Sequence, residues 1–90
     1  MERRILPVEN VIGTELGGEA VLLNTETGVY FGLNSLGTRI WTLIGGGTSE
    51  DTLLVQLQSE YEVDAAQLRS DVSEFVGVLA SKSLVQVDEH

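Results

Sequence analysis

The chain lacks most of the side chains that enzymes use for covalent or metal chemistry. It contains no cysteine, and its one histidine, His90, is the last residue. The absence of cysteine excludes disulfides, thiolate nucleophiles and cysteine-based metal sites. A single histidine at a terminus, where chain order is lowest, argues against a catalytic triad or a histidine-based metal cluster. The carboxylates are numerous but scattered, with no evident acid–base pair, so we expect a protein that is not an enzyme and that binds neither metal nor cofactor.

Basic residues are also scarce, with five lysines and arginines against fourteen acidic residues and a formal net charge of −9. Because such a charge repels phosphate backbones, nucleic acid is not an expected partner. No apolar run approaches the roughly 20 residues that span a bilayer, so no membrane partner is expected. The opening stretch, "MERRILPVENVIG", lacks the sustained apolar segment of a signal peptide, and the expected location is the cytoplasm.

A length of 90 residues is typical of one domain, and we treat residues 1–90 as a single domain. A chain of this size buries only about 60–65% of its unfolded surface, which leaves room for one modest core and none for a large enclosed active site. The apolar pattern changes once along the chain, from the alternation of strands before residue 34 to helical spacing after it.

The first third of the chain has the composition of strands separated by turns. Residues 5–16 predict a ragged first strand, with Pro7 favouring an edge or entry position. "EAVLLN" (19–24) and "VYFGL" (29–33) predict the two arms of a hairpin closed by "NTETG". Three strands joined in sequence form an antiparallel meander, whose first and third strands are its edges.

Residues 34–82 predict three helices. Asn34 or Ser35 can cap the first helix, Thr48 the second and Asp64 the third. A short extended tail follows the last helix. The predicted fold class is therefore α+β, with a three-stranded antiparallel sheet followed by a three-helix bundle, similar to a winged helix-turn-helix.

Two motifs in this half resemble functional sites. The glycines at 45–47 follow a helix and precede no lysine, so they indicate a helix stop rather than a phosphate-binding loop. "NSL" at residues 34–36 is similar to the Asp-Ser-Leu attachment site of acyl carrier proteins, which are also small, acidic and helical. Ser35 directly follows a strand, however, and carrier proteins have no such sheet, so a helix cap is the favoured interpretation.

Residues 29–33 carry the most informative pattern. Because neighbouring side chains of a strand point to opposite faces, Tyr30 and Phe31 cannot both face the same side. Either both rings serve in packing, or one forms an aromatic wall beside an open strand edge. The strand has no lysine, proline or charge to protect its edge, so it is expected to pair with another strand. That strand can come from a ligand or from a second copy of the chain, in a homodimer.

Three segments in order, "LLNTETGVYFGLNSLGTRIW", "GTSEDTLLVQLQSEYEV" and "LRSDVSEFVGVLASKSLV", resemble the PqqD family, which is named after pyrroloquinoline quinone biosynthesis protein D. The resemblance covers roughly residues 18–87. It includes the aromatic return strand, the Ile40-Trp41 helix and the ending Asp71-Val72…Phe75…Leu79. The wider class consists of the RiPP recognition elements of ribosomally made, modified peptides, and within it the chain is most similar to the free-standing leader-binding proteins of lasso-peptide pathways.

The resemblance implies a mechanism of peptide recognition. In the family, the leader peptide of a precursor adds as an extra strand to the third strand, and its side chains enter a groove against the third helix. The protein would then present the precursor to a separate enzyme, such as a transglutaminase-like cysteine protease that removes the leader, or another modifying enzyme. Carried over to this sequence, the peptide-binding candidates are Val29, Tyr30, Phe31, Gly32, Leu33, Leu68, Arg69, Asp71, Val72, Phe75, Val76 and Leu79.

Some of these residues also have simpler explanations. Asp71 and Arg69 lie on opposite flanks of the third helix, and solvation or capping accounts for each of them as well as ligand contact does. A winged-helix transcription factor remains the alternative function, and an acyl-carrier-like protein modified at Ser35 is a weaker one. The strong negative charge argues against the first and the preceding strand against the second.

Overall fold

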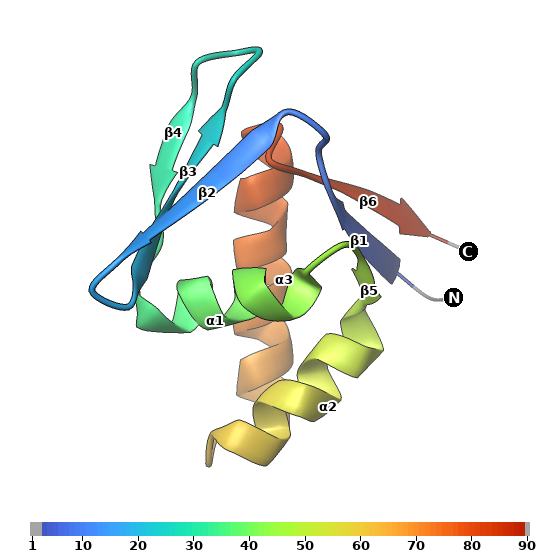
Figure 1. Ribbon diagram of the computed structural model, residues 1–90. Helices are drawn as coiled ribbons and strands as arrows, with labels where there is room; N and C mark the ends of the chain where they lie inside the picture. The colour runs from blue at the N-terminus through green and yellow to red at the C-terminus, as the bar shows by residue number, and fades with distance from the viewer. Residues whose placement is uncertain (1–2, 90) are drawn as a thin grey trace.

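The computed structural model describes residues 3–89, and His90 lies outside them. The described chain forms three helices and two small antiparallel sheets (Figure 1). In order, the elements are β1 (Arg3–Pro7), β2 (Val11–Leu16), β3 (Glu19–Asn24), β4 (Tyr30–Gly32), α1 (Ser35–Ile44), β5 (Thr48–Ser49), α2 (Glu50–Glu60), α3 (Ala65–Ser81) and β6 (Val85–Glu89). The prediction of an α+β protein with a three-stranded antiparallel sheet and three helices is confirmed.

The first sheet is the predicted meander, in the order β2-β3-β4. Gly17 and Gly18 join β2 to β3 with positive φ angles of 62° and 84°, the conformation of a two-residue type I′ turn that glycine favours. On the other side of β3, Leu22 is paired with Phe31 of β4. β3 is therefore the central strand, and both β2 and β4 are edges.

The prediction of one strand across residues 5–16 is wrong. The chain leaves β1 after Pro7 and begins β2 in the other sheet. β1 pairs along its whole length with β6 and also meets β5, which gives a second sheet of order β5-β1-β6. Ile5 in β1 is fully buried, whereas β2 is mostly exposed. One continuous strand could not occupy both environments, so the chain breaks between them.

The helix caps follow the predictions with one exception. Asn34 caps α1 and Asp64 caps α3, and each side chain accepts a hydrogen bond from a backbone N–H in the first turn. α1 ends at the first glycine of the glycine run, as expected. α2 is capped by Ser49 rather than by Thr48. Thr48 is paired with Ile5 of β1, and this pairing moves the start of the helix by one residue.

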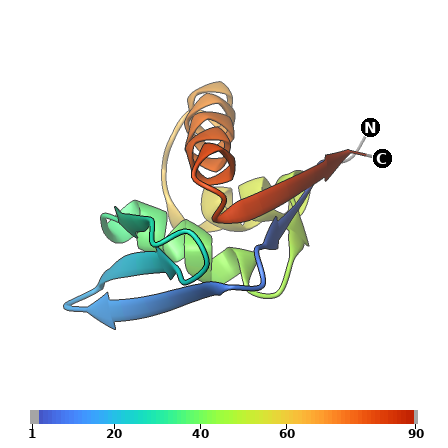
Figure 2. The same ribbon diagram turned by 90° about the horizontal axis from the view of Figure 1, so that it is seen from above.

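One hydrophobic core joins the helices to both sheets. Its largest fully buried side chains are Ile5, Leu22, Ile44, Leu53, Leu57, Val72, Val76, Leu79 and Leu84. The two sheets lie on either side of α3, as both views of the molecule show (Figures 1 and 2). Within residues 3–89, each helix is too short or too polar to span a bilayer. The shared core fixes β4 at a set distance from α3, which determines the shape of the site described next.

Candidate functional site

The outer edge of β4 offers unpaired backbone groups. The Leu33 N–H donates to the Ala20 carbonyl at 2.7 Å, and the Asn24 N–H donates to the Val29 carbonyl at 2.9 Å. Along an antiparallel strand, residues alternate between facing the partner strand and facing away from it. Tyr30 and Gly32 alternate with the residues bonded to β3, so their N–H and C=O groups point away from the sheet.

Two side-chain hydrogen bonds hold β4 in place relative to the helices. The buried Ala20 N–H donates to Thr38 Oγ1 at 2.8 Å, which joins β3 to α1. At the other end of the sheet, Asn24 Nδ2 donates to the Ser83 carbonyl at 2.8 Å, just beyond the end of α3. Both bonds link segments far apart in sequence, and together they anchor the sheet to the helices at two points.

The side chains of β4 face two different environments. Phe31 is half-buried and faces the helices, where the ammonium of Lys82 lies 5.5 Å from the centre of its ring. Tyr30 is 69% exposed. Gly32 presents no side chain, and a Cβ built there would meet no atom within 4 Å. The edge is therefore open for the close approach of another backbone.

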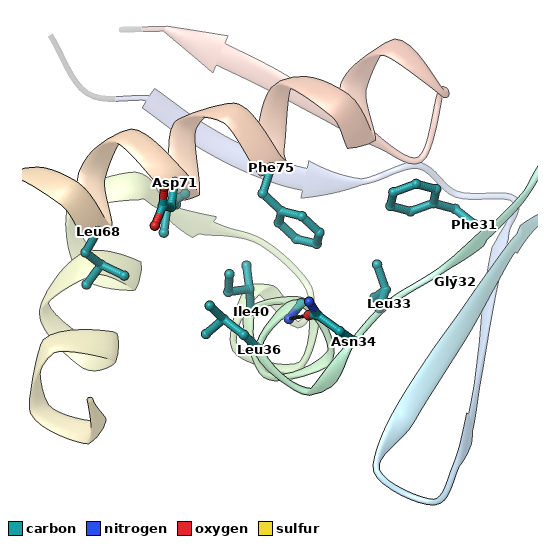
Figure 3. A pocket seen from close by; sticks show the side chains of 11 residues that line it. Phe31, Gly32, Leu33, Asn34, Leu36, Ile40, Leu68, Asp71 and Phe75 are labelled. Carbon is teal, nitrogen blue, oxygen red and sulfur yellow. Dashed lines mark hydrogen bonds between the residues drawn. The ribbon is translucent and has the colours of Figure 1, made fainter. Parts of the chain in front are cut away.

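An apolar pocket of about 260 Å³ lies beside this edge, between β4, α1 and α3 (Figure 3). It is lined by Phe31, Gly32, Leu33, Asn34, Leu36, Gly37, Ile40, Leu68, Asp71, Val72 and Phe75. Its two polar side chains each accept a hydrogen bond within the protein. Asn34 Oδ1 accepts the capping hydrogen bond at 2.8 Å, and Asp71 Oδ1 accepts one from Gln67 Nε2 at 2.8 Å. The pocket therefore suits apolar side chains better than a polar small molecule.

Gly37 allows the wall of the pocket to close. A Cβ at this position would lie 3.2 Å from Cε1 of Phe75 and 3.3 Å from Asn34 Oδ1. Because glycine has no Cβ, the Phe75 ring can lie directly against the first turn of α1. The ring consequently forms the side of the pocket between α1 and α3.

The structure places the predicted peptide-binding residues in several environments. The ones that line the pocket are Phe31, Gly32, Leu33, Leu68, Asp71, Val72 and Phe75. Val76 and Leu79 are fully buried in the core, and Arg69 is exposed, with its guanidinium 3.9 Å from Asp51. Tyr30 belongs to the open edge but not to the lining, and Val29 precedes β4 with its carbonyl bonded to the Asn24 N–H. Their part in binding stays a prediction.

Sequence reasoning missed the contribution of α1. Leu36, Gly37 and Ile40 line the pocket, and so does the capping Asn34. Leu36 and Ile40 have the spacing of one helix face, which on its own is typical of core packing. Leu36 is nevertheless 36% exposed, while Ile40 is only 3% exposed. An apolar helix face that starts directly after an unprotected edge strand was the available signal.

The electrostatic features of the described residues do not indicate a reaction centre. No cluster of three or more metal-ligating side chains occurs within residues 3–89. The resolved pKa changes belong to an ion pair outside the pocket, between Arg39 of α1 and Glu60 of α2. The guanidinium contacts both carboxylate oxygens, at 2.8 and 2.7 Å, and lowers the pKa of Glu60 to about 2.

Comparison with known proteins agrees with this geometry. Residues 19–85 match the family described as coenzyme PQQ synthesis protein D (PqqD). The chain belongs to the PqqD family. That assignment, made from the strand, turn and helix pattern, is confirmed. No curated protein matches the chain significantly.

A solved structure resembles this fold along nearly its whole length. It is TbiB1 in complex with the TbiA(beta) leader peptide, which has 33% sequence identity to this chain and a TM-score of 0.85. The match covers 90% of this chain and 94% of TbiB1. The protein with the similar fold thus holds a leader peptide.

Proposed function

We propose that this protein is a non-catalytic adaptor that binds the leader segment of a ribosomally made precursor peptide. The leader would add as a strand to the open edge at residues 29–33. One observation carries the proposal: the outward backbone groups of β4 lie directly beside an apolar pocket of about 260 Å³. The likeness to TbiB1 in its leader complex supports the same function.

Strand addition would use both features at once. A peptide strand bonded to the outward groups of Tyr30 and Gly32 would lie about 4.8 Å from β4. Every second side chain of the peptide would point toward α3, where apolar anchors can enter the pocket. Main-chain bonds would supply affinity and the pocket would supply specificity. A few anchors would provide most of the binding energy, because the peptide loses conformational freedom on binding.

The second half of the proposal concerns the next protein in the pathway. We propose that the bound precursor is presented, in the cytoplasm, to a separate processing enzyme. In lasso-peptide-type biosynthesis this enzyme would be a transglutaminase-like cysteine protease that removes the leader, although another modifying enzyme would suit the same adaptor. A chain with no cysteine must obtain such chemistry from a partner.

Titration with the leader segment of the precursor encoded beside this gene tests the proposal. We expect a dissociation constant between roughly micromolar and nanomolar, and no binding of a scrambled leader of the same composition. Absence of association with every neighbouring leader would reject the assignment. Tight, salt-sensitive binding to duplex DNA would instead favour a winged helix-turn-helix transcription factor, against the net charge of −9.

Two further outcomes are distinguishable. A mass increase after incubation with a phosphopantetheinyl transferase would favour a carrier protein modified at Ser35, and we expect the mass to stay unchanged. A homodimer through the β4 edge would use the backbone groups that the leader needs, so addition of leader should dissociate it. A dimer that binds leader without dissociating would have its interface elsewhere.

A further inference from the structure

Strand addition alone leaves the register of a bound peptide poorly defined. Because side chains alternate between the two faces of a strand, a shift of two residues keeps the same face toward α3 and preserves the main-chain bonds. The lining of the pocket is mostly apolar, and it accepts one aliphatic side chain about as well as another. Something else in the site has to select a single register.

Lys82 has an unusual position for a cation in this protein. Arg3, Arg39 and Arg69 each have a carboxylate within ion-pair distance. Within residues 3–89, the ammonium of Lys82 has no carboxylate within that distance, and instead lies over the ring of Phe31, 5.5 Å from its centre. Lys82 is half-buried as a residue, and its ammonium lies over Phe31, which lines the pocket, so it is available to a carboxylate that arrives with a ligand.

The backbone around Lys82 is well fixed. Its N–H donates to carbonyls in the last turn of α3, so the residue caps the C-terminal end of the helix. The next residue, Ser83, adopts a positive φ of 58°, which reverses the chain. The Ser83 carbonyl accepts the hydrogen bond from Asn24 described above. Lys82 is therefore held at a defined distance from the edge of β4 before any ligand binds.

The other end of the site carries the opposite charge. Lys82, the C-cap of α3, follows Asp71 by eleven residues, close to three whole helical turns, so the two residues lie on about the same flank, roughly 16 Å apart along the helix axis. Phe75 lies between them on this flank. In the close-up, Asp71 lies toward Leu68 at one end of the pocket, and Phe31, beneath Lys82, lies at the other (Figure 3).

We propose that Lys82 and Asp71 set the register of the bound peptide, by pairing with one acidic and one basic or hydrogen-bond-donating side chain that flank its apolar anchors. This inference rests on the proposed function of leader binding. In a protein of net charge −9, an acidic peptide side chain is repelled except beside a cation, so Lys82 determines where that side chain lies.

The geometry predicts the spacing of the two charged peptide residues. An extended strand rises about 3.3 Å per residue, so a separation of about 16 Å corresponds to roughly five residues. Both side chains must face α3, which requires an even separation, of about four or six residues. Figure 3 shows β4 and α3 running in opposite directions: α3 runs from Leu68 toward Phe75, whereas the chain of β4 runs back from Phe31 toward Leu33. A peptide antiparallel to β4 would therefore present its basic residue before its acidic one.

Selection from a display library of random fourteen-residue peptides tests this pattern. The intact protein should enrich peptides with an acidic residue four or six positions from a basic or amide residue, with apolar residues between them. Lys82→Glu should enrich peptides with a basic residue at the acidic position. Enrichment without this charge pattern, or the same peptides from both proteins, would overturn the inference and leave the proposed function intact. Failure to enrich any peptide would count against strand-adding peptide binding itself, and against this inference with it.

A binding cycle on one selected peptide measures the contact directly. Replacing the peptide's acidic residue by its amide should weaken binding by roughly three- to tenfold, as should Lys82→Gln, and the two changes together should cost no more than either alone. Lys82→Arg should restore affinity. Arg39→Gln removes the same charge from a residue outside the pocket and should leave affinity unchanged. Additive losses in the cycle would show that the two groups do not pair.

The salt dependence of peptide affinity distinguishes direct pairing of Lys82 from a purely structural role. Raising the ionic strength should lower the affinity of the intact protein for the acidic peptide, and should change its affinity for the amide form of that peptide much less. Equal salt dependence of the two peptides would contradict direct pairing. Thermal unfolding of each variant shows whether a change in affinity comes from loss of the fold.

Discussion

The β2-β3-β4 sheet has two open edges, and they differ in their surroundings. β2 is the longer of the two strands, and it is mostly exposed. The outward backbone groups of its edge include those of Glu15, whose charge discourages pairing with another strand. None of the residues that line the pocket comes from β2. β4 is short and uncharged, and it borders the pocket. The comparison suggests what the proposal depends on: the two edges differ less in length than in whether an apolar pocket lies beside them, and only β4 has one.

The largest expected effect comes from removing an outward N–H from β4, with the same change in β2 as its control. Gly32→Pro should weaken leader binding by about 2–3 kcal/mol, because it deletes a donor to the peptide and places the ring against the incoming strand. Glu15→Pro removes the corresponding N–H from β2 and should leave leader affinity unchanged. Isothermal titration with the leader measures both. Gly32→Ala controls for the side chain itself, since its Cβ would meet no atom within 4 Å.

A smaller effect separates the two aromatic residues of β4. Phe31→Ala removes part of the pocket lining and should cost about 1–3 kcal/mol of leader affinity. Tyr30→Ala should cost less than about 0.5 kcal/mol, because the ring is 69% exposed and lies outside the lining. Fluorescence titration and thermal unfolding of both variants provide the test. Equal losses would mean that the bound peptide also covers the outer face of β4.

The smallest effect concerns an ion pair that touches neither edge. The Glu60 pKa is lowered to about 2 from its usual 4.5, so the Arg39–Glu60 pair stabilises the fold fully above pH 4.5 and progressively less as the pH falls toward 2. Both side chains are partly exposed to solvent, so the contribution is small. The melting temperature of the intact protein should exceed that of Glu60→Gln by a constant margin above pH 5, and the margin should shrink on acidification. Leader affinity at neutral pH should be the same for both.

Local sequence signals predicted the parts of the fold that depend on neighbouring residues. Asn34 and Asp64 cap helices because a side chain reaches a backbone N–H only a few residues away. The glycine pair at 17–18 closes a hairpin for a similarly local reason. The break after Pro7 could not be predicted, because it depends on β6 pairing with β1 from the opposite end of the chain.

The candidate site was predictable only in part for the same reason. The unprotected strand and the third helix were both identified, and the pocket lies between them. The pattern of apolar residues could not tell that Leu36 faces the pocket while Val76 and Leu79 face the core. That division depends on how far α1 and β4 stand from α3, a distance set by long-range contacts such as Thr38 with Ala20.

Hydrogen exchange of individual backbone amides tests the central claim most directly. The amides of Tyr30 and Gly32 point outward from β4, and those of Gly13 and Glu15 point outward from β2. On addition of the leader, we predict that exchange slows at Gly32 and Tyr30 and is unchanged at Gly13 and Glu15. Protection at β2 instead, or tight binding with no protection at β4, would contradict strand addition to this edge.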